Sequence, residues 1–245
     1  NGLQDDGQSG INGVTVELWR VGGGAPFQTT VTANDGNGQP GYYLFDSVAP
    51  GSYFVQFVKP TGYQFTVRGP TGSKDPSDSD PDTATGRTEN FNLAPAETDL
   101  SWDAGLYRPV TIGDYTWVDT NGNGNVDPGE SPLDGVGIQI SDSGGNVLAT
   151  LTTGAAGGFP PGTYLLSGLP PGVYRAAVVN IPPTYLPSGQ TQDTSPFLSS
   201  GQSDLTLDFP FIGTTAVSLQ ALLATRAANF TVVTWTTSQE TDNEG

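Results

Sequence analysis

Residues 123–136 read NGNVDPGESPLDGV, and residues 1–14 read NGLQDDGQSGINGV. The two stretches align without a gap, and seven of their fourteen positions are identical: Asn, Gly, Asp, Gly, Ser, Gly and Val. Self-similarity of this kind is typical of a chain built from repeated structural units. The match therefore predicts two copies of one domain, and the rest of the organisation follows from it.

Strand patterns follow the repeat in both copies. GVTVELW at 13–19 corresponds to GVGIQIS at 135–141, and YYLFDSVAPGSYFVQFVKPTGY at 42–63 corresponds to TYLLSGLPPGVYRAAVVNIPPTY at 163–185. Apolar residues alternate along these stretches, which places them on one face of a strand. The predicted inward residues are Val14, Val16, Leu18, Tyr53, Val55 and Phe57 in the first copy, and Val136, Ile138, Ile140, Tyr174, Ala176 and Val178 in the second.

Turn residues separate these short strands. The chain has 34 Gly and 20 Pro among 245 residues, and no segment with helical periodicity interrupts either copy. Short strands at regular spacing with such turns indicate an all-β fold of two tandem β-sandwiches. We expect domains at 1–108 and 109–213 and a strand-rich segment at 214–245. The first copy lacks a counterpart of the strand TIGDYTWVD at 111–119.

Charge and residue usage exclude several classes of function. The formal net charge is −17, with eight basic residues, so we expect no nucleic-acid partner and an affinity for divalent cations. The chain has no His and no Cys, so the usual nucleophile and base pairs cannot form and we predict no enzyme. The sequence shows no signal peptide, initiator Met or run of about 20 apolar residues. We therefore expect a processed chain or a piece of a longer one, without direct membrane insertion.

The clearest chemical motif is DTNGNGNVDPGE at 119–130. It fits the calcium-loop template D-x-[DN]-x-[DN]-G-x5-E, in which hard oxygen ligands are spaced around one point. Gly124 stands where the loop must bend sharply. A strand precedes the loop, so a structural calcium site is expected, and a plain Asn/Gly hairpin is the alternative. The predicted ligands are Asp119, Asn121, Asn123, Asn125 through its backbone carbonyl, Asp127 and Glu130.

These motifs together resemble a known family. The resemblance is carried in the second copy by the stretch from IGDYTWVDTNGNG to GVGIQI and by GTYLLSGLPPGVY, and in the first copy by DPSDSDPD and WDAGLY. The chain resembles the SdrD B-like domain, the B-type repeat of serine-aspartate surface proteins, which is related to the B repeats of collagen adhesins. The resemblance covers about 1–108 and 109–213. It implies prealbumin- or immunoglobulin-like sandwiches that act as calcium-stiffened spacers, secreted to a bacterial cell surface.

A second acidic motif, KDPSDSDPDT at 74–83, lies in the first copy. Like charges this dense repel unless a cation joins them, and the resemblance implies a calcium ion here; a solvated acidic loop is the alternative. The candidate ligands are Asp75, Asp78, Asp80, Asp82 and Asp103. The second copy lacks an aspartate-rich loop and has only TQDTSPF in the corresponding place, so the resemblance gives no support for a second metal site there.

Both ends of the sequence look incomplete. Residues 214–245 contain two alternating β-branched stretches that resemble the start of a fibronectin-like domain, which suggests a fragment of a longer surface protein. A second explanation is head-to-tail self-association, in which the surplus strand TVVTWTTS of one subunit completes the first domain of the next. Joining the two ends then builds a calcium loop shared between subunits, with ligands Asp242, Glu244, Asn1, Asp5 and Gln8.

We therefore expect a non-enzymatic, extracellular structural protein, a calcium-stiffened stalk or a fibre subunit, with calcium as its cofactor. The alternative is an adhesin module that binds a glycan or a host protein. Its binding surface would involve exposed aromatic residues, for which Trp19, Trp117 and Tyr185 are candidates. Asn229 lies in a glycosylation acceptor pattern, Asn-Phe-Thr, that also arises by chance.

Overall fold

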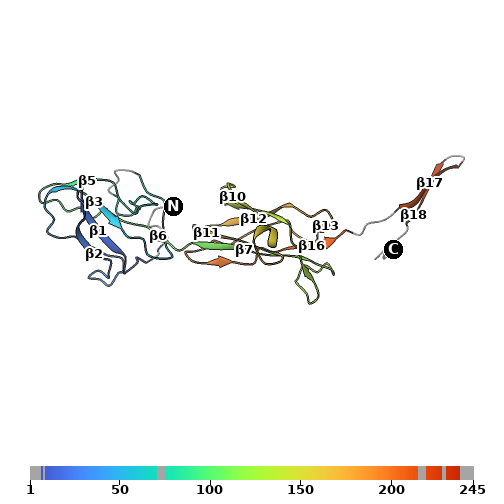
Figure 1. Ribbon diagram of the computed structural model, residues 1–245, viewed down its shortest axis with the longest axis horizontal. Coiled ribbons are helices and arrows are strands. Elements are labelled where there is room, and N and C mark those ends of the chain that lie inside the picture. Colours follow the sequence, from blue (N-terminus) through green and yellow to red (C-terminus); the bar gives the residue numbers. More distant parts are fainter. Residues whose placement is uncertain (1–6, 8, 71–74, 215–218, 228–229, 238–245) are drawn as a thin grey trace. The chain divides into compact units, whose positions relative to one another are not determined.

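The computed structural model describes residues 7, 9–70, 75–214, 219–227 and 230–237. The chain divides into two compact units. The first consists of residues 1–111, 167–173 and 197–203, and the second of residues 112–166, 174–196 and 204–245. All elements of the described part are strands, apart from one turn of 3-10 helix at Ala155–Gly157, so the predicted all-β class is confirmed (Figure 1).

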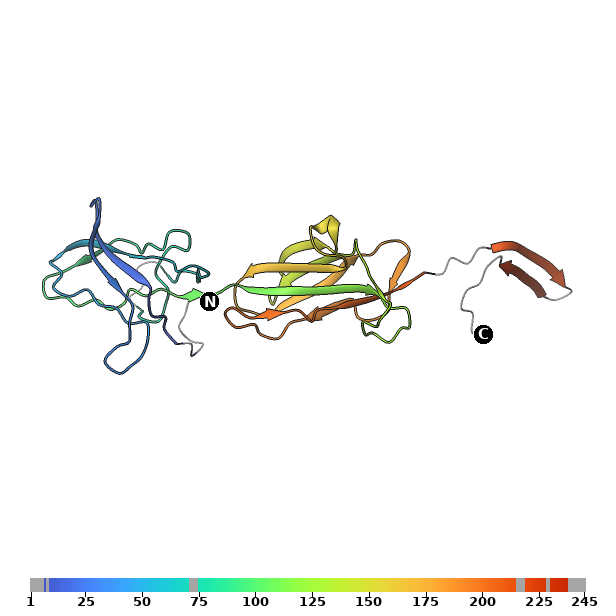
Figure 2. The same cartoon turned by 60° about the horizontal axis from the view of Figure 1, so that its bottom comes forward.

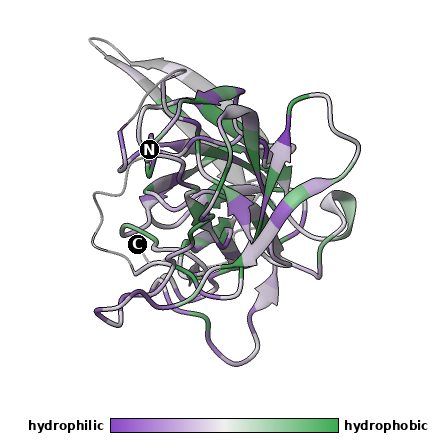
Figure 3. Ribbon diagram, turned by 90° about the vertical axis from the view of Figure 1, so that its left-hand side faces the viewer, coloured by the Kyte–Doolittle hydropathy of each residue, from purple (hydrophilic) through white to green (hydrophobic). Residues whose placement is uncertain are grey.

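The first unit is built on a four-stranded antiparallel sheet. Its strand order is β2 (Pro26–Val31), β1 (Thr15–Arg20), β3 (Gly51–Phe57) and β5 (Phe91–Leu93). Val16 pairs with Phe57 and Leu18 with Val55 across β1 and β3, so these apolar side chains share one face of the sheet. That face is buried, as the alternation predicted, while hydrophilic residues alternate with apolar ones along the strands (Figure 3).

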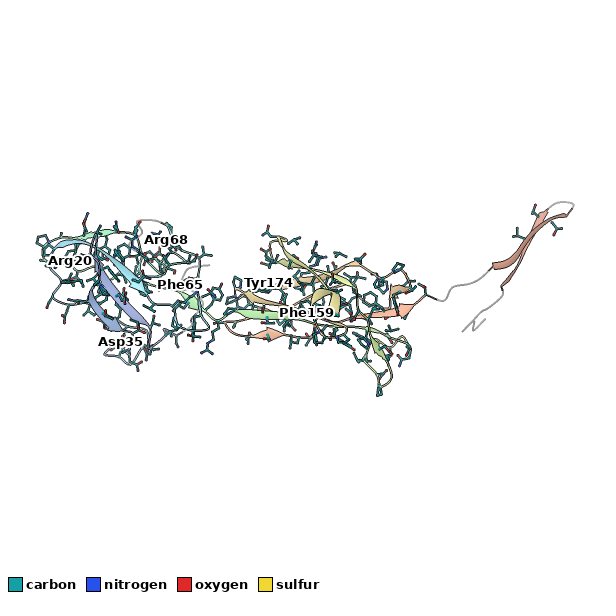
Figure 4. All side chains as sticks on the ribbon, viewed as in Figure 1. Arg20, Asp35, Phe65, Arg68, Phe159 and Tyr174 are labelled. Carbon is teal, nitrogen blue, oxygen red and sulfur yellow. The ribbon has the colours of Figure 1, made fainter. Side chains whose placement is uncertain are left out.

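A smaller sheet completes the core of the first unit. Here β4 (Gln64–Phe65) pairs with β6 (Leu106–Tyr107). Phe65, which Figure 4 labels, packs with Trp102 and with the inward residues of β1 and β3. Phe91 stacks on Trp102 with ring centroids 4.6 Å apart. These large aromatic side chains exclude water from the core and contribute most of its buried apolar area.

The second unit is a β-sandwich. One sheet has the order β10 (Val147–Thr152), β9 (Gly137–Asp142), β12 (Tyr174–Asn180) and β14 (Gln192–Thr194). The other has the order β11 (Thr163–Leu169), β7 (Val110–Val118), β16 (Phe209–Gly213) and β13 (Tyr185–Pro187), and two short strands, β8 (Ser131–Pro132) and β15 (Ser203–Asp204), also pair with β7. The long strand β7 runs through the middle of this sheet (Figure 2).

Inward residues of both sheets form the core of the second unit. Val136, Ile138 and Ile140 are fully buried, and Tyr174 and Ala176 of β12 are also buried, as the sequence pattern predicted. Figure 4 labels Tyr174 in the second unit. Phe209 and Phe211 lie opposite, on β16, which runs parallel to β7. The predicted inward face continues to Val178, which is only partly buried near the end of β12.

The two copies differ at the position of β7. In the second unit β7 lies between β11 and β16. The corresponding parts of the first unit are residues 42–48 and β6, and the described residues place no strand between them. Residues 43–48 form no strand; Tyr42 makes a single bridge to Ala33. Among the described residues, this segment therefore joins no strand ladder.

The end of the chain forms a separate hairpin. β17 (Leu219–Ala227) and β18 (Phe230–Thr237) pair antiparallel, with Ala227 opposite Phe230 and Leu222 opposite Trp235. The hairpin is a two-stranded sheet of its own in the described part of the chain. No described helix has the length and apolar character needed to cross a membrane.

Candidate metal sites

Asp119 is the anchor of the predicted calcium loop. It follows the last residue of β7, and its side chain is fully buried although the loop around it is exposed. Its Oδ1 accepts hydrogen bonds from the backbone N–H groups of Gly122 (2.8 Å) and Asn123 (3.2 Å). Its Oδ2 accepts from the Gly124 N–H (2.9 Å) and the Ser188 hydroxyl (3.2 Å). The first half of the loop is therefore folded around the Asp119 carboxylate by hydrogen bonds.

The ionised form of Asp119 is favoured by these contacts. Burial alone would raise the pKa of this carboxyl, but the donated hydrogen bonds from Gly124, Gly122, Ser188 and Asn123 outweigh burial and lower it. Gly124 adopts a φ of 77°, a conformation that a residue with a side chain resists, and this lets its N–H point back at the carboxylate. The sharp bend expected at Gly124 is therefore present.

The second half of the loop folds back onto the first. Asp127 Oδ2 accepts from the side-chain amides of Asn121 (2.8 Å) and Asn123 (2.6 Å). Glu130 closes the loop, because its Oε1 accepts from the Thr120 N–H (2.7 Å) and its Oε2 accepts from the Asp127 N–H (3.0 Å). The loop thus brings together Asp119, Asn121, Asn123, Asp127 and Glu130. Half a turn of each Asn amide would present its oxygen, a calcium ligand, in place of its nitrogen.

Asn125 has a different role. Its backbone N–H donates to Asn123 Oδ1 (2.7 Å), and its side-chain amide donates to the Asn123 carbonyl (3.3 Å). Its side chain therefore braces the loop from within. This arrangement is compatible with the expected use of its backbone carbonyl as a ligand.

Only two aspartates of the acidic tract at 74–83, Asp78 and Asp80, are buried near Asp103. Asp78 and Asp80 are buried, at 4% and 6% exposure, and the Asp103 N–H donates to Asp80 Oδ2 at 2.6 Å. The Asp80 N–H donates in turn to the Asp103 carbonyl at 2.9 Å. One oxygen of Asp78, Oδ1, is buried and has no hydrogen-bond partner. Asp78, Asp80 and Asp103 thus form an enclosed acidic group between the tract and the end of the first unit.

The other two aspartates of the tract point elsewhere. Asp75 accepts hydrogen bonds from the N–H and hydroxyl of Ser77, and Asp82 accepts from the N–H and hydroxyl of Thr85. Both side chains are exposed, and these hydrogen bonds lower their pKa values. The structure therefore separates the five candidates of the tract into three that meet and two that cap local turns.

Two carboxyl groups of the buried acidic group, those of Asp80 and Asp103, have raised pKa values. The pKa of Asp80 is raised to about 7, chiefly by burial and also by the charges of Asp78 and Asp103, whereas the hydrogen bond from Asp103 and the charge of Arg68 oppose this rise. Burial and then Asp78 raise the pKa of Asp103 to about 7. Each group would release its proton more easily if a cation entered.

Carboxylates alone do not complete either site. In the described residues, no group of three or more acidic side chains is placed to hold a metal ion by itself. A calcium ion bound in the loop or at the acidic group would need amide, backbone or water oxygens as well, and calcium commonly takes such ligands. The composite site of Asn1, Asp5, Gln8, Asp242 and Glu244 lies outside the described residues, as does Asn229.

Sequence reasoning missed one acidic group. In the second unit, Asp208 Oδ1 accepts a hydrogen bond from the Tyr115 N–H at 3.0 Å, which places Asp208 beside Asp114 of β7, and the charges of Asp114 and Asp204 both contribute to the raised pKa of Asp208. The signal was present in the repeat: DLSWD at 99–103 and DLTLD at 204–208 share the spacing D-L-[ST]-x-D. These residues are not consecutive, so they do not form an aspartate-rich loop.

The aromatic candidates for a binding surface are all partly or fully engaged. Trp19 stacks on Phe54 with centroids 5.9 Å apart, and its indole N–H donates to Glu17 (2.9 Å). Trp117 is buried, and Tyr185 is half-buried in β13. Packing accounts for Trp117, whereas Trp19 remains accessible at one face.

Two curated relatives cover most of the chain. Serine-aspartate repeat-containing protein D of Staphylococcus aureus (strain MW2) is 32% identical over 230 residues, which are 89% of this chain and 16% of the relative. Serine-aspartate repeat-containing protein F of Staphylococcus epidermidis is 33% identical over 206 residues, 83% of this chain and 11% of the relative. The chain therefore spans less than a fifth of the length of these relatives.

Solved structures with similar architecture are more distant. The Bacillus anthracis TIE protein is 11% identical with a TM-score of 0.36, over 85% of this chain and 32% of that one. GBS52, the minor pilin of Streptococcus agalactiae, is 15% identical with a TM-score of 0.33, over 85% of this chain and 87% of that one. At these values the likeness carries no argument about function.

The family itself is established by its sequence model. The description SdrD B-like domain matches residues 1–106 and again residues 110–221, which together are nearly the whole chain. The expected resemblance is thereby confirmed, and with it the expected location at a bacterial cell surface. The chain belongs to the SdrD B-like domain family.

Proposed function

We propose that this chain is a non-enzymatic spacer of a bacterial surface stalk, and that calcium bound in the 119–130 loop stiffens its second unit. The spacer role suits a chain of tandem β-units without His or Cys. The observation that carries the calcium role is the buried carboxylate of Asp119, to which three backbone N–H groups of the loop donate. A plain surface turn does not need a fully buried carboxylate.

The position of the loop would allow a bound ion to stabilise the sheet that contains β7. It joins the end of β7 to β8, and β8 pairs back onto β7 at Trp117 and Val118. The Asp119 N–H donates to the Phe211 carbonyl of β16 at 2.7 Å. A cation held by the loop would therefore link the ends of the neighbouring strands β7 and β16. Ion binding to the folded state alone stabilises that state by mass action.

Limited proteolysis tests this function. With a broad-specificity protease, we expect cleavage within residues 120–130 to be at least about tenfold slower in about 1 mM calcium than in chelator, since extracellular calcium modules saturate near that concentration. Magnesium at the same concentration is the matched control and should protect much less, because it demands a tighter octahedral shell. Equal cleavage rates in calcium and chelator would refute the calcium role.

Self-association is a second candidate function, favoured by one observation. Residues 42–48 and β6 of the first unit flank the position that β7 fills in the second unit. Tyr42 and Leu44 are 47% and 46% exposed there. A strand from a second copy, for which β18 is the candidate, would join this open position by backbone hydrogen bonds and extend the assembly head to tail.

Light scattering on the complete chain tests self-association. If the strand is donated, the mass should grow with concentration, and removal of residues 230–245 should return the chain to a monomer. A peptide with the β7 sequence VTIGDYTWV should cap the open position and shorten the polymers. Polymers that persist after the deletion would rule out this mode of assembly. A chain that stays monomeric under all conditions would rule out self-association.

An adhesin role is the alternative proposal. Its strongest support is the accessible pair of Trp19 and Phe54, on which the Arg87 guanidinium lies 4.0 Å from the Phe54 centroid. Such a surface suits a glycan ring or a protein side chain. Loss of a saturable ligand interaction on Trp19→Ala would favour this role.

A further inference from the structure

The first unit has an aromatic pair on the solvent side of its main sheet. Val16 and Leu18 of β1 turn toward the core, so Glu17 and Trp19 lie on the opposite face of the strand. Trp19 pairs with Phe54 of the neighbouring strand β3, and the two ring centroids are 5.9 Å apart with the ring planes within 9° of parallel (Figure 1). Both side chains are half-buried. This pair lies outside the core and needs an explanation other than core packing.

The second copy shows that the fold does not require this pair. In the aligned repeats, Trp19 corresponds to Ser141 and Phe54 corresponds to Arg175. Ser141 and Arg175 pair across β9 and β12, just as Trp19 and Phe54 pair across β1 and β3. The same face of the sheet therefore forms with a small hydroxyl residue and an exposed arginine in place of two aromatic rings. Packing between the rings adds stability to the first copy but is dispensable for the fold.

Polar side chains of both charge signs adjoin the aromatic pair. Glu17 pairs with Gln56 of β3, and Gln56 makes a backbone bridge to Arg87, so a carboxylate, an amide and a guanidinium stand in one row across the sheet. Glu17 Oε2 accepts a hydrogen bond from the Trp19 indole N–H at 2.9 Å. The Arg87 guanidinium lies 4.0 Å from the centroid of the Phe54 ring. These contacts hold both charged groups beside the rings.

The charges on this face select the class of partner. One carboxylate and one guanidinium balance each other within the row, so a strongly basic or a strongly acidic ligand would meet a like charge. The formal net charge of −17 on the whole chain repels polyanions further. A neutral sugar ring presents C–H groups that pack on an aromatic face and hydroxyl groups that both donate and accept hydrogen bonds. Aromatic rings beside carboxylate, amide and guanidinium groups match both properties.

We propose that this face of the first unit binds neutral oligosaccharide chains through Glu17, Trp19, Phe54, Gln56 and Arg87. The accessible face of the Trp19 indole takes the C–H face of a sugar ring, Glu17 accepts hydrogen bonds from its hydroxyl groups, and Gln56 and Arg87 donate to them. The site deepens the adhesin alternative, on which it rests, and it is independent of the calcium-stiffened spacer role. One site per chain is expected, because the second copy lacks the aromatic pair.

Isothermal titration calorimetry on the complete 245-residue chain tests this site. The probes are two neutral sugar chains, cellohexaose and fully N-acetylated chitohexaose, with a heparin hexasaccharide as the anionic comparison and hexa-arginine as the basic one. Saturable binding of at least one neutral chain, at one site per protein, is expected, and the charged probes should not compete with it. The proposal is overturned if neither neutral chain binds, or if heparin or hexa-arginine binds in their place.

Substitutions assign the binding to this face. Trp19→Ala should weaken it by about tenfold or more, because the stacking surface is lost. Arg87→Gln keeps the aromatic pair and should weaken it by about threefold or more through loss of a charged donor, which keeps the test valid if Trp19→Ala does not fold. Arg175→Ala is the matched control, since it removes an exposed arginine from the strand position that corresponds to Phe54, and it should leave the affinity unchanged. Equal affinities for the parent, Trp19→Ala and Arg87→Gln would refute the site.

The outcomes separate this site from the spacer role. If the neutral sugar chains do not bind while calcium still protects residues 120–130 from proteolysis, the sugar site is overturned and the calcium-stiffened spacer stands. If a neutral chain binds in the way that depends on Trp19 and Arg87 while calcium gives no protection, the sugar site stands and the calcium role fails.

Discussion

Asp119→Asn is expected to abolish the calcium-induced rise in the melting temperature of the second unit. The substitution keeps the shape of the side chain but replaces one carboxylate oxygen with an NH2 donor. Two donors would then face each other in the buried position that now receives the Gly122, Asn123 and Gly124 N–H groups. Calorimetry in saturating calcium should show a melting temperature lower than that of the parent by on the order of 10 °C.

The control for this variant is Asp142→Asn. Asp142 also accepts backbone N–H groups, those of Gly144 and Asn146, in a turn of the same unit. Its replacement should lower the melting temperature in calcium and in chelator by similar amounts and leave the calcium-induced rise intact. A full calcium response in Asp119→Asn would contradict the assignment of Asp119 as a ligand.

In chelator, the stability of the first unit is expected to fall as the pH rises from about 4 to about 7. Burial raises the pKa values of Asp80 and Asp103 to about 7, against 3.8 for the unperturbed group. Between these values the folded state keeps protons that the unfolded state has lost, so the unfolding free energy decreases with pH. Below pH 4 this contribution is fully present, and above pH 7 it is lost. Calorimetric scans at pH 4, 5.5 and 7 measure the trend.

Two comparisons establish which groups cause this trend. Asp103→Asn cannot ionise and should flatten the decline, whereas Asp82→Asn should leave it, because Asp82 is exposed and its pKa is lowered by its hydrogen bonds with Thr85. Saturating calcium should reduce the decline if the cation binds the Asp78, Asp80 and Asp103 group, since a cation favours the ionised form. Stability that rises steadily from pH 4 to 7 in chelator would be inconsistent with this account.

Local sequence pattern was sufficient for much of the fold. Alternation of apolar and polar residues identified the buried faces of β1, β3, β9 and β12, because successive side chains of a strand point to opposite faces and only one face of these strands is buried. The spacing of Asp119 to Glu130 likewise identified a loop that closes on itself, since its hydrogen bonds connect residues only a few positions apart. Such features depend on short stretches of chain.

Features that depend on distant segments could not be predicted. Asp75 and Asp82 stand in the same tract as Asp78 and Asp80, yet only the latter two turn inward, because backbone pairing between Asp80 and Asp103 fixes the tract against the end of the unit. Asp114 and Asp208 are 94 positions apart and become neighbours because β16 runs parallel to β7. These residues become neighbours through the topology of the fold, which the local spacing of residues in the sequence does not indicate.

The absence of a β7 counterpart in the first copy was visible in the alignment of the repeats. Its structural consequence was not. Tyr43 packs against the core and donates a hydrogen bond to Trp102, whereas residues 44–48 form no strand in the described part of the chain. Apolar burial holds the segment in place without strand pairing.

Single-molecule stretching of the chain in calcium and in chelator tests the central claim most directly, because a spacer carries load along its length. The account predicts that the unfolding force of the second unit is higher in calcium, and that Asp119→Asn unfolds at the chelator value under both conditions. Equal unfolding forces for the parent chain in calcium and in chelator would contradict the claim that calcium stiffens this protein.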